Sequence, residues 1–99
     1  MPVEIVDNTE HSRFEIFVDG TVAGFADYRL LPTKIVFTHT EVRPEYEGQG
    51  LAGKLVGHAL DASRDTGLRV VPLCPYVAKY IERHASYKDL VDSDDSVGG

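Results

Sequence analysis

The stretch VRPEYEGQGLA, residues 42–52, separates two different periodicities in this sequence. Upstream of it, residues 34–42 alternate between apolar and polar side chains, which is typical of a β-strand. The stretch is therefore predicted to be a glycine-containing turn between a strand and a helix, because mostly apolar residues recur downstream at the spacings of three and four that mark one helix face. These residues are Leu51, Ala52, Leu55, Val56, Ala59, Leu60 and Ser63.

The remaining sequence predicts an α/β domain, of the α+β kind, whose twisted sheet is mainly antiparallel. Asp19-Gly20 suits the positive φ angles of a tight hairpin turn, and Gly67 suits a left-handed stop of the long helix. Pro75 favours the start of a second helix, whose inner face we expect to be Val77, Tyr80, Ile81 and His84. The expected order is β-β-β-β-α-β-α, with strands at residues 3–6, 13–18, 21–31, 34–42 and 69–73.

Length and composition limit the chain to one small domain. Its 99 residues have room for one hydrophobic core, and an apolar content of 42% is ordinary for a globular protein. We expect a domain at residues 3–91 and a disordered acidic tail at residues 92–99. The net charge is −6, but residues 1–88 carry only −2 of it, because the other four negative charges belong to Asp89, Asp92, Asp94 and Asp95. This balance argues against binding to nucleic acid, which favours broad basic surfaces.

Several other classes are disfavoured by what the sequence lacks. Cys74 is the only cysteine, so no intramolecular disulfide forms, and the four histidines have no zinc-type spacing. No apolar run reaches the length of a membrane span, and the N-terminus has neither the basic start nor the apolar core of a signal peptide. We expect a cytoplasmic protein that binds no metal and no membrane.

The glycines of the turn point to an anion site. Glycines at the start of a helix let backbone N–H groups approach a phosphate, and the helix dipole favours it. Gly48, Gly50 and Gly53 fit the dinucleotide fingerprint, but the strand that follows ends without the required acidic residue. Gly48, Gly53 and Lys54 approach a P-loop, but Leu55 replaces the magnesium-binding Ser or Thr. A further alternative is that the glycines only form a tight link.

The pattern Glu47-x-x-Gly50-x-Ala52, after an antiparallel strand that ends at Val42, resembles the GNAT superfamily of acetyl-coenzyme A-dependent N-acetyltransferases. The signature of that family is Arg or Gln, two residues, Gly, one residue, then Gly or Ala. The similarity runs from about Val18 to Leu90 and is closest to a compact branch of about a hundred residues. Glu47 departs from the signature, and the helices that form part of the acceptor site in larger members are missing.

The resemblance implies how acetyl-coenzyme A would bind. Backbone N–H groups of the turn hold the diphosphate in that family, and the preceding strand hydrogen-bonds the pantetheine arm. Tyr80 lies about where a tyrosine acts as general acid toward the leaving thiolate in larger members. The cofactor-binding residues expected from the resemblance are Val42, Arg43, Glu47, Gly48, Gln49, Gly50, Leu51, Ala52 and Tyr80.

Acetyl transfer to an amine needs a base, and residues 35–42 offer two candidates. Strict alternation puts His39 and Glu41 on the same face as Ile35 and Phe37, beside the expected pantetheine strand. Either side chain can act as general base, Glu41 directly or through a water molecule. The alternatives are an ion pair on an edge strand, or a histidine that covers the core.

Cys74 is the third candidate for catalysis, because it ends the short strand before Pro75. The resemblance implies that the acetyl thioester lies where the two strands flanking the long helix diverge, close to this thiol. A thiol activated by a helix N-terminus or by His39 can accept an acetyl group transiently. A free cysteine is also often simply buried.

Together these observations predict an acetyl-coenzyme A-dependent N-acetyltransferase. The acceptor is an unidentified amine on a small molecule or peptide, acetylated by direct attack or through Cys74. The alternative is a non-catalytic module of the same fold that binds coenzyme A or another protein. We expect a monomer or a weak homodimer.

Overall fold

The computed structural model of the chain describes residues 2–92. In this part of the chain the predicted order of strands and helices is confirmed, with two short 3-10 helices added. The elements are β1 (Val3–Asn8), β2 (Arg13–Val18), β3 (Thr21–Leu30), β4 (Lys34–Val42), η1 (Pro44–Tyr46), α1 (Leu51–Asp65), β5 (Arg69–Pro72), α2 (Pro75–Arg83) and η2 (Ala85–Leu90).

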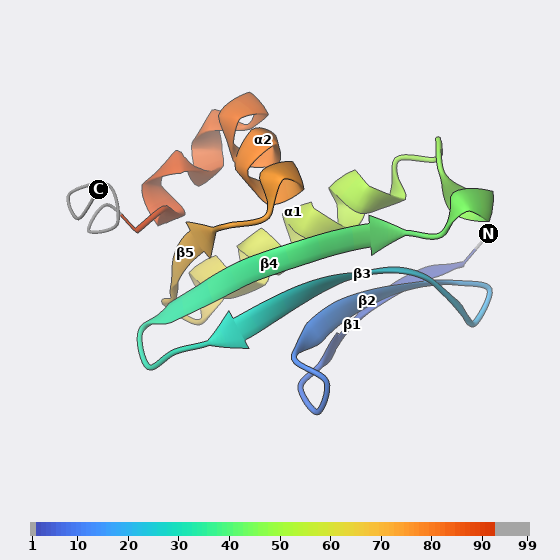
Figure 1. The fold of residues 1–99 in the computed structure, drawn as a ribbon, viewed down its shortest axis with the longest axis horizontal. Helices are drawn as coiled ribbons and strands as arrows, with labels where there is room; N and C mark the ends of the chain where they lie inside the picture. Colours follow the sequence, from blue (N-terminus) through green and yellow to red (C-terminus); the bar gives the residue numbers. More distant parts are fainter. Residues whose placement is uncertain (1, 93–99) are drawn as a thin grey trace.

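The strands form one mixed sheet in the order β1-β2-β3-β4-β5, which confirms the predicted α/β fold. β1 to β4 are antiparallel neighbours, whereas β5 runs parallel to β4. Within β4, only residues 34–37 pair with β5, and Figure 1 shows β4 continuing toward the turn after β5 has ended. The N–H of Cys74 donates the last bond across this seam, to the carbonyl of Phe37 at 2.9 Å. Beyond this point the edge of β4 has no neighbouring strand in the described residues.

Two turns follow from their sequence as predicted. Asp19 and Gly20 have φ angles of 51° and 81°, which is the double positive φ of a tight hairpin. Gly67 has a φ of 76° and follows α1 by two residues. Both positions therefore use residues that tolerate the left-handed region.

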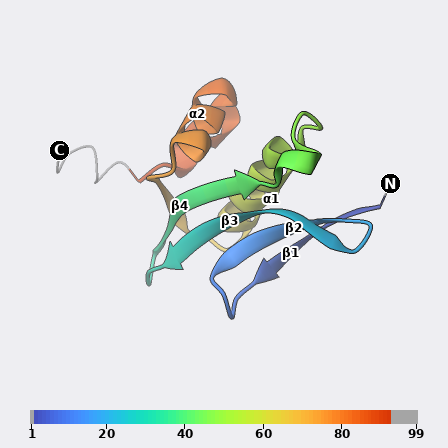
Figure 2. The same cartoon turned by 45° about the vertical axis from the view of Figure 1, so that its right-hand side comes forward.

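The core lies between the sheet and the helices. α1 packs against β2, β3, β4 and β5, and α2 packs against β4, β5 and α1. Figure 2 shows α1 along one face of the strands and α2 beyond the β4 edge. Val77 and Ile81 of α2 are buried as predicted, but His84 is exposed and forms the C-cap of the helix. In the described part of the chain, no helix has the length and apolar character needed to cross a membrane.

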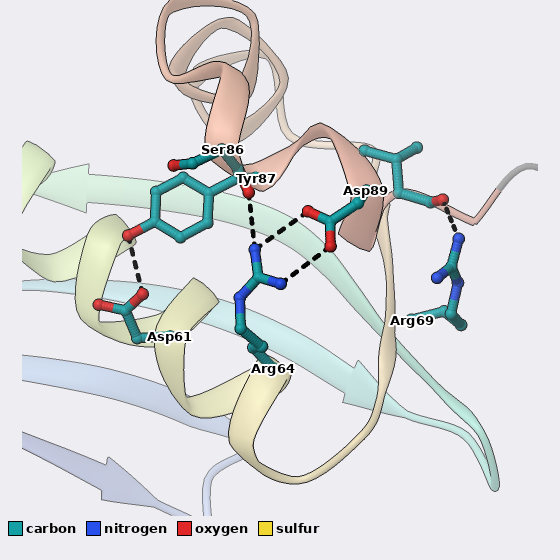
Figure 3. Close-up of polar contacts among 7 residues, drawn as sticks. Asp61, Arg64, Arg69, Ser86, Tyr87 and Asp89 are labelled. Carbon is teal, nitrogen blue, oxygen red and sulfur yellow. Dashed lines mark hydrogen bonds and ion pairs between the residues drawn. The ribbon is translucent and has the colours of Figure 1, made fainter.

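Helix η2, which the sequence pattern did not predict, is tied to α1 by polar contacts (Figure 3). Arg64 donates two hydrogen bonds to Asp89, at 2.9 and 3.0 Å, and one to the carbonyl of Ser86 at 2.6 Å. The hydroxyl of Tyr87 donates to Asp61 at 2.8 Å. These bonds fix the segment after α2, and with it the position of α2 beside α1.

The described residues include Asp92, the residue that follows the predicted domain boundary at residue 91. Asp92, which was predicted to begin the tail, is 5% exposed, and its N–H donates to the carbonyl of Val70 at 2.9 Å. Its carboxylate also pairs with Lys34. This ion pair and the backbone bond hold Asp92 against β5. The rest of the predicted tail, residues 93–99, lies outside the described residues.

Candidate functional site

The turn before α1 exposes backbone in a form that only glycine adopts easily. Gly48 and Gly50 have φ angles of 85° and 72°, both in the left-handed region. A Cβ atom at either position would have no neighbour within 4 Å, so both face open space. Gly50 is the N-cap of α1, and no side chain caps this helix start. The N–H groups of the first helical turn have no intrahelical partner, so they are available to a ligand.

This turn forms one wall of a hollow of about 320 Å³, which we call the turn hollow. The opposite wall is the end of β4, whose edge away from β3 pairs with no other strand of residues 2–92. Of the residues predicted to bind the cofactor, Val42, Glu47, Gly48, Gly50, Leu51 and Ala52 line it. The lining is completed by Thr40, Glu41, Tyr46, Gly53 and Tyr76.

Three residues predicted to bind the cofactor lie elsewhere. Arg43 is exposed, its N–H donates to the carbonyl of Ala23 at 2.8 Å, and it lines a different hollow. Gln49 is exposed at the tip of the turn and is not part of the hollow's lining. Tyr80 lies against α1 in a third hollow. The turn hollow is therefore built from backbone and from apolar side chains, with Glu47 and Glu41 as the charged members of its lining.

His39 and Glu41 lie together, but the predicted face is wrong. In the β3–β4 ladder Asp27 pairs with His39 and Tyr28 with Phe37, so Thr38 is an extra residue, a β-bulge. The bulge turns His39 and Glu41 to the face opposite Phe37 and α1, which we call the outer face. There they hydrogen-bond to each other at 3.1 Å, with side chains 56% and 58% exposed.

On the outer face, an aromatic ring and an arginine lie close to the His39–Glu41 pair. The ring of Phe25 lies 6.1 Å from that of His39, and the guanidinium of Arg13 lies 4.6 Å from the centre of the Phe25 ring. Glu41 lines both the turn hollow and a hollow on this face that Arg13, Phe25 and Arg43 share. Glu41 thus lies at the boundary between the two hollows.

Cys74 lies just after β5, where the pairing between β4 and β5 ends. It is the N-cap of α2, and the residue is 3% exposed. Its Sγ donates to Oγ1 of Thr40 at 3.5 Å. The bulge places Thr40 on the face opposite His39, so Cys74 and His39 lie on different sides of β4. The predicted activation of the thiol by His39 has no support in this arrangement.

Tyr80 and Tyr76 line a hollow of about 330 Å³ between α1 and α2, which we call the helix hollow. Burial, followed by the nearby Tyr76 and Asp61, raises the pKa of Tyr80 above its usual value, so its hydroxyl is protonated at neutral pH. Tyr80 does not line the turn hollow, whereas Tyr76 lines both hollows. The complete lining of the helix hollow is Gly50, Gly53, Lys54, Tyr76, Lys79, Tyr80, Arg83 and His84.

Sequence reasoning missed Thr40 as a wall of the turn hollow and the cations of the helix hollow. The contact of Thr40 with Cys74 depends on the bulge in β4, which the alternation of the sequence does not reveal. Lys79 and Arg83 are spaced by one helical turn, which is a detectable signal for a common face. Their approach to Lys54 depends on how α2 packs on α1, which no local pattern reveals.

The site suits an extended ligand that carries a diphosphate. The open turn offers N–H groups and space where a Cβ would stand, and the free edge of β4 offers backbone groups to an extended chain. The two hollows share Gly50, Gly53 and Tyr76, so a single ligand can occupy both. These properties fit coenzyme A better than a mononucleotide, because only the former has a long amide-containing arm.

Two solved structures are similar to this fold. A GCN5-like candidate N-acetyltransferase from Staphylococcus aureus, solved by NMR, matches with a TM-score of 0.69 and 25% identity over 90% of this chain and 87% of that one. The ribosomal-protein-alanine N-acetyltransferase of Brucella melitensis biovar Abortus 2308 shares the fold, with a TM-score of 0.57 and 23% identity. That match covers 64% of this chain and 49% of the Brucella enzyme, about half of its length.

Sequence comparison identifies the family. A search of curated proteins gives no match. Residues 13–90, however, match the family model of the GCN5-related N-acetyltransferases. This match spans most of the chain and agrees with the resemblance seen in the turn. The chain therefore belongs to the GCN5-related N-acetyltransferase family.

Proposed function

We propose that this protein transfers an acetyl group from acetyl-coenzyme A to an amine on a small molecule or peptide. The observation that carries the proposal is that the open glycine turn lies directly beside the edge of β4 that no strand of residues 2–92 covers. A diphosphate at the turn and an extended amide arm along the strand need these two features side by side.

Residues 48–52 would hold the diphosphate through backbone N–H groups and the positive end of α1. The negative charge of the Glu47 side chain is compatible with phosphate binding at this turn, because the groups that would bind the phosphates belong to the main chain. Thr40 and Val42 would position the pantetheine arm along β4. When bound, acetyl-coenzyme A supplies the activated acetyl group as a thioester.

We assign the role of general base to Glu41. It lines both the turn hollow and the outer-face hollow, so it can meet an amine that approaches from the outer face. As the amine nitrogen bonds to the acetyl carbon, the carbon–sulfur bond of the thioester would break and coenzyme A would leave as a thiolate. The Glu41 carboxylate accepts the proton that the amine loses, and the thiolate takes a proton from solvent. Nε2 of His39 lies 3.1 Å from Oε1 of Glu41, and this hydrogen bond orients the carboxylate.

Direct attack by the amine is the route we favour over a relay through Cys74. Cys74 is 3% exposed and its thiol donates to Thr40, so attack by the sulfur requires the thiol to move and lose this bond. Intact-mass spectra after incubation with acetyl-coenzyme A test the choice. A single acetyl adduct that disappears in Cys74→Ser would overturn the direct route.

The proposed function is tested by calorimetric titration with acetyl-coenzyme A, followed by transfer assays on amines, peptides and polyamines. We expect binding and acetylation of at least one amine class, with Glu41→Gln binding normally and transferring slowly. Absence of binding at millimolar acetyl-coenzyme A would refute the proposal. Binding without transfer to any amine would instead favour a non-catalytic module that binds coenzyme A.

A further inference from the structure

The outer-face hollow is lined by charged residues of both signs. Its volume of about 500 Å³ falls within the range of roughly 300–1,000 Å³ that is typical of small-molecule sites. The charges belong to two arginines, Arg13 and Arg43, and two glutamates, Glu41 and Glu45. The lining is completed by Val22, Gly24, Phe25 and Pro44. A ligand in this hollow therefore meets both cations and anions.

Arg13 is fixed beside the hollow by contacts that leave part of its guanidinium free. Nε and Nη2 each lie 2.9 Å from Oε2 of Glu15, a residue that is only 7% exposed. Nδ2 of Asn8 donates to the other carboxylate oxygen of Glu15 at 3.2 Å. The guanidinium also lies 4.6 Å from the centre of the Phe25 ring. Nη1 of Arg13 has no hydrogen-bond partner within residues 2–92, so its N–H groups are available to a ligand.

The strand register places Glu41 next to this arginine without pairing the two. Phe25, whose ring lies against the guanidinium, is the direct neighbour of Glu41 in the β3–β4 ladder. Neighbouring strands lie roughly 4.8 Å apart, so the two charges are offset by about one strand spacing. Within residues 2–92, Arg13 pairs with Glu15 and Glu41 with His39. A ligand whose own cation and anion are a few bonds apart can bridge the gap.

Arg43 brings a second cation to the hollow from the segment after β4. Its N–H donates to the carbonyl of Ala23 at 2.8 Å, which fixes the main chain at this point. The residue is exposed and forms no ion pair within residues 2–92. Exposed ion pairs contribute little to binding, because solvent screens them. The more buried Arg13 is thus the main anchor for an anion, and Arg43 supports it.

This arrangement of charges suits a zwitterion better than a polyanion or a polycation. A phosphate monoester carries a charge of about −1.5 to −2 at neutral pH, which Glu41 and Glu45 would oppose. A polyamine would place like charge against both arginines. A molecule with one amine and one carboxylate satisfies both signs.

We infer that the outer-face hollow selects acceptors that carry a carboxylate close to the amine, as a small amino acid does. The amine lies at Glu41, and the carboxylate accepts hydrogen bonds from Nη1 of Arg13 and from the Arg43 guanidinium. The inference rests on the proposed function, which places acetyl transfer at Glu41, and it narrows the acceptor to one chemical class.

The test compares glycine and β-alanine with their amides, glycinamide and β-alaninamide, as acceptors for the intact chain. Mass spectrometry of the acetylated products gives kcat/KM for each acceptor, referred to the concentration of unprotonated amine. Charge-assisted hydrogen bonds predict a kcat/KM roughly tenfold or more higher for each acid than for its amide. The difference should lie mainly in KM, because the carboxylate takes no part in the reaction.

Two variants remove the cations from the hollow. Arg13→Gln/Glu15→Gln removes the anchor without leaving a buried charge unpaired, and the preference for the acid should fall to roughly threefold or less. Arg43→Gln changes an exposed side chain and should lower the preference by roughly 1.5- to fivefold.

The matched control is Arg29→Gln, on the same strand as Phe25. It removes an exposed charge outside the hollow and should keep the full preference. Because every variant meets the same acceptors, a change in the ratio between acid and amide does not depend on the basicity of their amines.

The outcomes separate the inference from the proposed function. Equal kcat/KM for the acids and their amides would overturn the inference and leave acetyl transfer intact. An unchanged preference in either variant would also overturn it, as would faster acetylation of O-phosphoethanolamine or of a polyamine than of both amino acids. If no amine of any class is acetylated, the proposed function fails, and the inference fails with it.

Discussion

Replacing Gly50 by alanine tests the backbone cradle, and the chain supplies its own control. Gly50 and Gly67 flank α1, with φ angles of 72° and 76°, and a Cβ at either would meet nothing within 4 Å. A non-glycine residue in the left-handed region costs about 1–2 kcal/mol. Both variants should therefore lose similar stability and unfold roughly 4–16 °C earlier, since about 1 kcal/mol lowers the midpoint of a domain this size by roughly 4–8 °C.

Only Gly50→Ala should affect the ligand. Its added methyl group points into the space that the diphosphate would fill, whereas that of Gly67→Ala points to solvent at the other end of the helix. Losing one charge-assisted bond to phosphate costs about 1.5–3 kcal/mol, which corresponds to roughly tenfold to a hundredfold weaker binding. Calorimetry with coenzyme A, at a temperature where both variants are folded, measures this difference.

Either of two results of this comparison would contradict the reasoning. If Gly50→Ala and Gly67→Ala bind coenzyme A equally well while losing similar stability, the open backbone of the turn is not the phosphate site. If both lose binding equally, the effect is one of helix stability rather than of the cradle.

Three further expectations concern catalysis, alkaline stability and the close approach of β3 to β4. Glu41→Gln should lower kcat by roughly 10²–10⁴-fold, the usual contribution of a general base, with an unchanged Kd for acetyl-coenzyme A; an unchanged kcat would assign the base elsewhere. Burial and the bond to Asp61 raise the pKa of Tyr87 to about 12, above its unfolded value of about 10. The stability that Tyr87 contributes through this raised pKa is thus complete below pH 10 and is lost as the pH rises through 12. In urea unfolding at several alkaline pH values, the free energy of unfolding should therefore fall less steeply with pH in Tyr87→Phe than in the unmodified chain; identical profiles would contradict this. Gly24→Ala should destabilise the protein by about 1–3 kcal/mol through overpacking, because its Cβ would lie 2.6 Å from the carbonyl oxygen of Glu41; a denaturation midpoint equal to that of the unmodified chain would refute this.

Local sequence signals predicted the parts of the fold that depend on local chemistry. The apolar spacing from Leu51 to Ser63 defines the buried face of α1, and Gly67 ends it, because both depend only on helix geometry. The hairpin at Asp19-Gly20 follows from the φ angles those residues tolerate. Gly48 and Gly50 marked the turn in the sequence, and glycine tolerates the positive φ angles that both positions have.

Features that depend on packing between elements were not predictable in this way. The bulge at Thr38 depends on the register between β3 and β4, and neither glycine nor proline marks it. It moved His39 and Glu41 to the outer face and separated them from Cys74. Likewise, η2 is held by Arg64 reaching Asp89, twenty-five residues away, which no periodicity reveals.

The most direct test of the central claim is an NMR titration of the amide signals with coenzyme A. If the turn binds the diphosphate, the amides of residues 48–53 should shift most. Signals of Val42 at the β4 edge and of Tyr76 should follow, and those of Gly20 and Gly67 should stay unchanged. Absence of shifts at millimolar coenzyme A, or shifts confined to residues outside the two hollows, would contradict the account.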